Sequence, residues 1–306
     1  MNVHEIAADL ADEQQDLGGI LEGLDDAAWA EATPSPGWSV TDQVGHLAYF
    51  DHAATTAITH PDRFRTMVDD LMGVMGAGEG AVDEHTLGRY RAIGPEGLLA
   101  EWRAGHRRLA EAAATLADDT RITWYGPSMG ARSFLTARLM EAWAHGQDIV
   151  DTVGAERAAT DRLRHIAQLG VITRTWTYVN RNLDPPDTDI DVVLTSPSGD
   201  TWSWGPGDAG DTVTGPAKAA HDGVTHFGKL GGDASQLMVL EREHADDAVF
   251  VQPSRDADVV YFTGGNPAHL LDTLNGSLLL TKIEQALERG AIVAGSSAGA
   301  MVMGPW

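Results

Sequence analysis

The spacing of apolar residues predicts that the first two thirds of the chain are helical. Residues 4–24 carry apolar side chains at helical intervals, and a second helix is expected to begin at the capping box Ser39–Asp42. The apolar stripe of this second helix consists of Val40, Val44, Leu47 and Phe50. Further helices are predicted over 96–117, over 133–153 with Ser133 as its cap, and over 160–181. The first four of these helices, joined by polar loops that include a glycine-rich loop over 73–80, predict an antiparallel bundle.

Beyond about residue 189 the pattern changes to short apolar runs of the kind that form strands. Residues 189–195 and 200–204 are predicted to pair around a Pro-Ser-Gly turn, and residues 211–214 supply a third strand. Buried strands are then predicted at 236–240, 258–262 and 291–294, with a helix at 278–288. Strand, helix and strand in this order predict a parallel sheet.

The expected fold class is α+β in three parts. A four-helix bundle occupies residues 1–183, a short β region occupies 184–216, and a partial α/β segment occupies 217–306. An incomplete parallel sheet leaves an unpaired strand edge, so copies of the chain are expected to associate through this last part.

Composition narrows the chemistry. The 306 residues have a formal net charge of −24, which disfavours binding to nucleic acid or to an anionic membrane surface. No apolar run reaches about 18 residues and the N-terminus lacks a signal-peptide pattern, so a cytoplasmic protein is expected. There are no cysteines, which excludes disulfides, thiolate nucleophiles and cysteine-ligated zinc.

A metal must then be held by histidine or carboxylate side chains, and one group of residues has a suitable spacing. Glu141 and His145 are four residues apart on a predicted helix, so their side chains share one face. His46 lies on another helix of the bundle and can meet them in its interior. Three such ligands are typical of a catalytic zinc site, with nickel, iron or manganese as alternatives. The same spacing is also common in ordinary surface pairs.

Two sequence blocks around these residues add a resemblance. Residues 37–48, GWSVTDQVGHLA, and residues 140–148, MEAWAHGQD, resemble the metal-binding domain of mycothiol-dependent maleylpyruvate isomerases, which belongs to the DinB-like superfamily of four-helix bundles. The resemblance covers about residues 5–215. It implies that His46, Glu141 and His145 hold a divalent metal, usually zinc. Asp148 is expected to orient His145 from behind, whereas His52 and His60 are expected not to bind the metal.

The resemblance also implies a reaction. In this family the metal lowers the pKa of a low-molecular-weight thiol such as mycothiol, and the thiolate attacks a small electrophilic substrate. The outcome is isomerisation of an unsaturated acid or transfer of the thiol. The absence of cysteine is compatible with this chemistry because the thiol comes from the cofactor.

A second motif lies at the C-terminal end. Residues 295–299, GSSAG, have the G-x-S-x-G form of a nucleophile elbow. Together with residues 256–266, DADVVYFTGGN, they resemble the cyanophycinase and dipeptidase E type of serine peptidase, with a glutamine-amidotransferase-like fold, over about residues 225–306. The resemblance implies that Ser297 is the nucleophile and that the backbone amides of Gly265 and Ala298 form the oxyanion hole.

The catalytic histidine and acid of that peptidase family follow the nucleophile, so we expect this segment to be truncated and inactive. His269 is a weak substitute base. The sequence therefore leaves three readings open: a metal- and thiol-dependent isomerase or transferase, a serine hydrolase, or a non-catalytic protein that binds metal or thiol. Two families in one chain also indicate a fusion.

Overall fold

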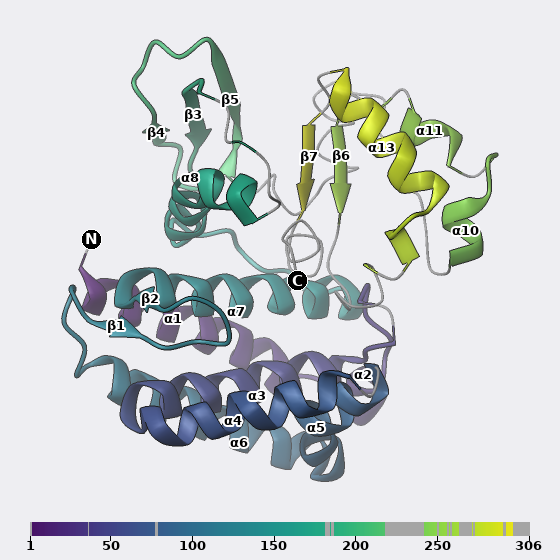
Figure 1. Ribbon diagram of the computed structural model, residues 1–306. Coiled ribbons are helices and arrows are strands. Elements are labelled where there is room, and N and C mark those ends of the chain that lie inside the picture. The colour runs from purple at the N-terminus through teal and green to yellow at the C-terminus, as the bar shows by residue number, and fades with distance from the viewer. Residues whose placement is uncertain are drawn as a thin grey trace. The chain divides into compact units, whose positions relative to one another are not determined.

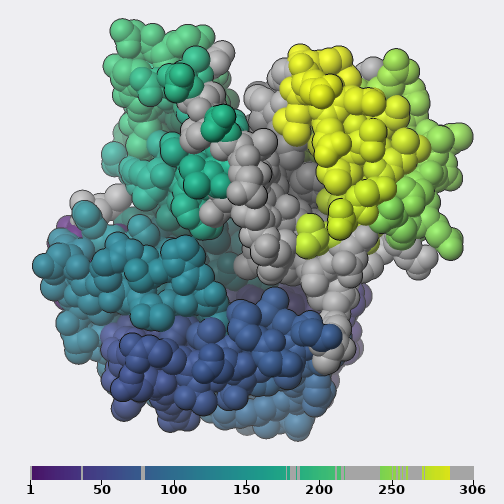
Figure 2. Space-filling view, in the orientation of Figure 1, coloured from purple at the N-terminus to yellow at the C-terminus, as the bar shows by residue number. Residues whose placement is uncertain are grey.

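Four long helices pack side by side as a bundle in the computed structural model of the chain (Figure 1). They are α1 (Val3–Glu22), α3 (Val40–Thr59), α6 (Gly94–Ala113) and α7 (Ala131–Val153). Both α1 and α3 pack against α6 and against α7, which closes the bundle. On the face shown in Figure 2, the teal atoms of the α7 region lie directly against the blue atoms of the region from α3 to α5.

The structure describes residues 2–35, 37–76, 79–180, 184, 187–217, 242–249, 251–255, 257, 259–262, 271, 273–289 and 292–295. Among these residues helices dominate and the sheets are small, which confirms the α+β class. No helix in the described ranges has both the length and the apolar character needed to cross a membrane.

Local signals explain where the bundle helices begin. The predicted capping box of α3 is present: Asp42 accepts a hydrogen bond from the backbone N–H of Ser39, and Ser39 Oγ accepts one from that of Asp42. The predicted start of α7 at Ser133 is wrong, because the helix begins at Ala131. A two-stranded hairpin, β1 (Arg121–Ile122) and β2 (Met129–Gly130), leads directly into α7 and sets its start.

Between the bundle helices lie three shorter helices that were not predicted: α2 (Asp26–Trp29), α4 (Pro61–Met75) and α5 (Glu79–Ala92). The predicted loop at 73–80 is therefore mostly helical, since Gly73–Met75 lies in α4 and Glu79–Gly80 in α5. These helices form despite the glycines because their apolar side chains pack into the core. Phe64 of α4 and Leu87 of α5 are completely buried.

The bundle core has two apolar layers with polar residues between them. One layer includes Leu10 and Ala53, and the other includes Leu17 and Ala48. The residues between these positions on α1 and α3 include Gln14 and Asp51, which are buried and hydrogen-bonded to each other. The interior of the bundle is therefore built to hold polar groups.

The remaining elements form small sheets. β3 (Ile190–Thr195) pairs antiparallel with β4 (Thr201–Trp204) and parallel with β5 (Asp211–Pro216). Further on, β6 (Val259–Phe262) pairs in parallel with β7 (Ile292–Gly295), and α13 (Leu278–Glu288) lies between them in the sequence. The predicted β-α-β order is confirmed. The predicted strand at 236–240 lies outside the described residues.

The described residues also form α8 (Leu163–Asn180), α10 (Arg242–Asp246) and α11 (Gln252–Arg255). The chain divides into two compact units, one of Met1–Ala158 with His165–Leu169 and one of Ala159–Arg164 with Gly170–Trp306. The division falls within α8. The three-part division at 183/184 and 216/217 stays a prediction.

Candidate metal centre

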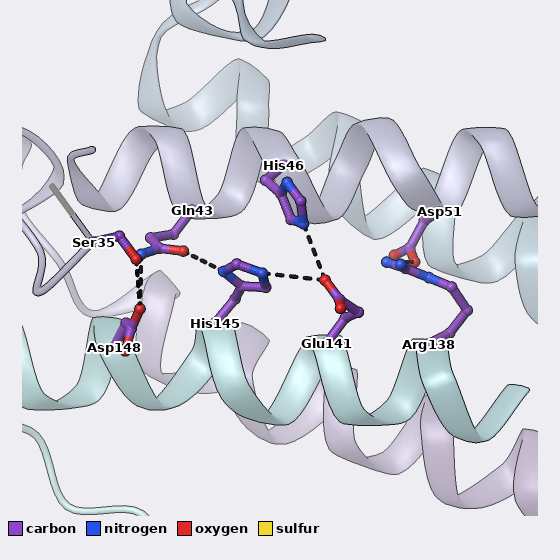
Figure 3. Close-up of polar contacts among 8 residues, drawn as sticks. All are labelled: Ser35, Gln43, His46, Asp51, Arg138, Glu141, His145 and Asp148. Carbon is purple, nitrogen blue, oxygen red and sulfur yellow. Dashed lines mark hydrogen bonds and ion pairs between the residues drawn. The ribbon is translucent and has the colours of Figure 1, made fainter. Parts of the chain in front are cut away.

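The three predicted ligands meet inside the bundle. His46 projects from α3, and Glu141 and His145 project from successive turns of α7 (Figure 3). The Nε2 atoms of His46 and His145 lie 3.1 Å and 3.2 Å from the same oxygen, Oε2 of Glu141. The three potential ligand atoms lie within 4.8 Å of one another, which is close enough to share one ion.

Burial and mutual contact set the charges of this cluster. The side chains of His46 and Glu141 are 15% and 14% exposed, and that of His145 is 6% exposed. Burial, with a smaller contribution from His145, lowers the pKa of His46 to about 4. Burial would raise the pKa of Glu141, but hydrogen bonds with His145 and His46 outweigh it and hold this pKa well below its usual range. At neutral pH the cluster therefore presents a carboxylate and a neutral His46.

A polar network lies behind His145. Nδ1 of His145 lies 2.5 Å from Oε1 of Gln43, which is completely buried. The amide nitrogen of Gln43 donates to Thr33 Oγ1 at 2.9 Å and to Asp148 Oδ2 at 3.1 Å. Asp148 also accepts a hydrogen bond of 2.9 Å from Ser35 Oγ. The group in contact with His145 is thus Gln43, and the predicted partner Asp148 lies one hydrogen bond further away.

Aromatic rings pack against the imidazoles of the cluster. The Trp38 ring lies 5.2 Å from that of His46 and 6.0 Å from that of His145, measured between ring centroids. The Phe50 ring lies 4.6 Å from that of His46, one helical turn along α3. These rings surround the imidazoles with apolar surface, which strengthens electrostatic interactions within the cluster.

A buried ion pair lies one turn along both helices. Arg138 Nη2 is 3.2 Å from Asp51 Oδ1, and their side chains are 4% and 1% exposed. Gln14 donates to the other carboxylate oxygen of Asp51 at 2.8 Å. Burial raises the pKa of Asp51, and Arg138 opposes that rise. Because the pair is held together by direct contact, it fixes α3 and α7 to each other beside the three candidate ligands.

The donor set fits a divalent metal. Two imidazole nitrogens and one carboxylate oxygen, drawn from two rigid helices, match the nitrogen and oxygen ligands that zinc and related ions prefer. Both imidazole nitrogens face one carboxylate oxygen at hydrogen-bond distance, so each nitrogen either donates an N–H to that oxygen or shares a bound cation with it.

The other predicted site residues are not brought to this cluster. His52 is half-buried further along α3, and His60 is exposed at the end of that helix. Ser297, Gly265, Ala298 and His269 lie outside the described residues.

Sequence reasoning missed Gln43, Trp38 and the Asp51–Arg138 pair. A signal for Gln43 exists, since it precedes His46 by three residues and therefore shares its helix face. Asp148 likewise lies three residues from His145, which it follows, and shares its helix face. Which of the two polar side chains contacts the imidazole depends on how α3 and α7 face each other, which spacing alone does not determine.

Comparison with known proteins divides the chain into a first and a last part, as its pattern of hydrophobic residues also does. A family model described as the mycothiol maleylpyruvate isomerase N-terminal domain matches residues 10–150, which include all three candidate ligands. A second model, Peptidase family S51, matches residues 214–306. The two matches do not overlap.

Two curated proteins share a larger part of the chain. The uncharacterized proteins Rv0036c and MT0041 of Mycobacterium tuberculosis are each 43% identical over 211 residues, which cover 69% of this chain and 80% of the relative. Two solved structures of the mycothiol-dependent maleylpyruvate isomerase, one of them of a mutant, share 19% identity at a TM-score of 0.46. They cover 71% of this chain and 86% of the solved chain. The chain therefore belongs to the mycothiol maleylpyruvate isomerase N-terminal domain family through its helical bundle, and its residues 214–306 match the model of Peptidase family S51.

Proposed function

We propose that the chain is a metal-dependent enzyme in which a small thiol, mycothiol or a related compound, attacks a small electrophilic substrate. The reaction is either isomerisation of an unsaturated acid or transfer of the thiol. The observation that carries the proposal is the convergence of His46, Glu141 and His145 inside the bundle. Membership in the maleylpyruvate isomerase domain family supports both the thiol and the type of reaction.

The residues of the cluster are suited to binding a cation. His46 is neutral at neutral pH because burial lowers its pKa, so its imidazole offers a lone pair without first losing a proton. Glu141 is ionised and supplies the negative charge. A divalent metal bound there, most simply zinc, would lower the pKa of a thiol and so supply a thiolate at neutral pH.

Charge around the cluster favours an anionic nucleophile. The buried charges of Asp51 and Arg138 compensate each other, so Glu141 supplies the negative charge among the three candidate ligands. Addition of a divalent cation makes the set net positive, which attracts a thiolate. Trp38 and Phe50 limit the access of water to His46 and so preserve this attraction.

The proposal is tested by turnover with the full chain. The protein is stripped with a chelator, reloaded with zinc, and assayed with mycothiol and other small thiols against an unsaturated acid and an alkylating electrophile. We expect thiol-dependent turnover that chelator removes and zinc restores, and that is lost in His46→Ala. His52→Gln serves as the matched control, because it removes a histidine from the same helix but from outside the cluster. Turnover that survives metal removal would contradict the proposal, and zinc binding without any turnover would favour a non-catalytic binding protein.

A second candidate function rests on the match of residues 214–306 to Peptidase family S51. In this reading Ser297 is the nucleophile of a serine hydrolase acting on small acidic peptides, with Gly265 and Ala298 as oxyanion donors. The parallel pairing of β6 with β7 agrees with the expected glutamine-amidotransferase-like sheet. Labelling of Ser297 by a fluorophosphonate probe would support this function, and absence of labelling would support an inactive segment.

Two further predictions accompany the proposed function. A cytoplasmic location suits an enzyme that uses a small thiol, because thiols are kept reduced in that compartment. Association of copies through the edge of the β6–β7 sheet is tested by light scattering after size-exclusion chromatography, with a single monomer mass as the contradicting result.

A further inference from the structure

The network behind His145 has a direction that the hydrogen-bond donors and acceptors determine. Thr33 Oγ1 donates its proton to the carbonyl oxygen of Trp38 at 3.0 Å, so it accepts from Gln43. Asp148 Oδ2 accepts from Ser35 and therefore also acts as an acceptor toward Gln43. Both protons of the Gln43 amide nitrogen are thus used, and the orientation of the amide is fixed.

The fixed amide leaves its oxygen facing His145. Oε1 of Gln43 has no proton to give, so the His145 Nδ1 atom at 2.5 Å must be the donor. The opposite orientation of the amide would place its oxygen against the carboxylate of Asp148 and its nitrogen against the imidazole. The two ring nitrogens of His145 therefore have different roles, since Nδ1 carries a proton and Nε2 faces Glu141 and His46 (Figure 3).

We propose that Gln43 is a positioning residue that selects the metal-binding nitrogen of His145. Held by Thr33 and Asp148, it keeps Nδ1 of His145 protonated and the ring oriented, so that Nε2 is the ligand. This inference rests on the proposed metal site and goes beyond it, because it assigns a role to a residue that does not touch the ion. Partners of this kind typically change metal affinity by about 10- to 100-fold.

The unaltered full chain gives the first test. Uniformly ¹⁵N-labelled protein is examined by NMR at pH 8 with and without zinc, and the ring signals of His145 are assigned by their loss in His145→Ala. We expect Nδ1 of His145 to carry a proton in both states and zinc to bind through Nε2. An unprotonated Nδ1, or zinc bound through Nδ1, would overturn the proposal.

Zinc affinity, measured by competition with a chromophoric chelator, gives the second test. Gln43→Leu removes the acceptor and is expected to weaken zinc binding about 10- to 100-fold. Gln147→Leu is the matched control, because it removes a buried glutamine of α7 whose amide donates to Asp151 and does not contact His145. The control should bind zinc as the wild type does. Equal affinity in a folded Gln43→Leu chain would overturn the role of Gln43.

An exchange variant separates positioning from simple support of the fold. In Gln43→Glu/Asp148→Asn the carboxylate and the amide change places, so the new carboxylate at position 43 accepts from His145 Nδ1 and the new amide at position 148 donates to that carboxylate. We expect zinc affinity equal to or above that of the wild type, since a carboxylate acceptor raises the basicity of the ligand. If Gln43→Leu fails to fold, this variant and the NMR measurement decide. An exchange variant that folds but binds zinc as weakly as Gln43→Leu would count against the proposal.

These outcomes remain distinct from those of the proposed function. Zinc bound through Nε2 of His145, without any thiol reaction, would leave the role of Gln43 intact and remove the proposed activity. Thiol turnover by the wild type, with unchanged zinc affinity in Gln43→Leu, would support the proposed activity and remove the role of Gln43.

Discussion

The helical bundle and the region from α10 to β7 use polar side chains in different ways. In the bundle, polar groups from distant segments meet in the interior: Gln43 contacts His145 across 102 positions of sequence, and His46 contacts Glu141 across 95. In the later region, such groups make contacts over shorter stretches of sequence: Arg242 donates to the backbone oxygen of Asn275, 33 positions away, and Asp246 accepts from the backbone N–H of Leu278, 32 positions away. Ser277 caps α13, and Arg242 pairs at the surface with Asp246, four residues away.

The two regions would therefore form a reactive site in different ways. In the bundle, the candidate site exists only once α3 and α7 are packed together, and no short stretch of sequence contains it. In the S51 segment, the predicted nucleophile and one oxyanion donor, Ser297 and Ala298, are neighbours in a single motif. If chemistry follows packing rather than motif, then changes in the bundle should have large effects and changes at the motif should have none.

The largest expected effect is the loss of metal from the bundle. His145→Ala or His46→Ala should reduce bound metal from about one equivalent to none, because each change leaves two ligands where a catalytic site requires three. Mass spectrometry of the purified chains measures the metal, and circular dichroism should show an unchanged helical content. Full metal content in both variants would contradict the assignment and move attention to the C-terminal motif.

The next effect concerns stability of the bundle. Arg138→Leu should lower its free energy of unfolding by about 3–5 kcal/mol, because it leaves the Asp51 carboxylate buried without its partner. Urea denaturation measures the change. Arg65→Leu, which breaks a largely exposed pair with Asp62, is the control and should have little effect. Removing both Asp51 and Arg138 should restore much of the loss, and an equal or greater loss in the double variant would contradict this account.

A smaller effect is expected from pH. The folded-state pKa of His46 is lowered from 6.5 to about 4, so in this interval the unfolded chain binds a proton that the folded chain does not. The stability of the metal-free bundle should therefore fall as the pH decreases from 6.5 toward 4. His46→Gln should reduce this slope, whereas His4→Gln, on the exposed surface of α1, should not. The slope is reduced rather than removed because burial also lowers the pKa of His106 to about 4.

The amino-acid sequence predicts the bundle helices and the three candidate ligands because both follow from spacing on single helices. The sequence does not predict α4 and α5, because the glycines at positions 73, 76, 78 and 80 are typical of a loop. These helices are stabilised instead by the burial of Phe64 and Leu87. The start of α7 is also missed, since a hairpin formed by residues before it sets that start rather than a side-chain cap.

The surroundings of the candidate site are less predictable for a related reason. Asp51 and Arg138 belong to no motif in the sequence, and only the facing of α3 and α7 makes them a buried pair. Gln43 and Asp148 have equivalent spacing to their neighbouring histidines, so the sequence cannot decide between them. Gln43 contacts His145 directly and Asp148 contacts Gln43, and the packing of α3 against α7 determines this arrangement.

The smallest expected effect is at the C-terminal motif. Ser297→Ala should change no activity of these 306 residues, because a serine needs a base and an acid to act as a nucleophile, and residues 298–306 contain neither a histidine nor a carboxylate side chain. Hydrolysis of acidic dipeptides and thiol turnover are measured side by side in the wild type and in this variant, with Ser296→Ala as the matched control. A loss of hydrolysis in Ser297→Ala alone would reverse the comparison between the two regions: the motif would then carry chemistry of its own, and the bundle would be a second, independent site.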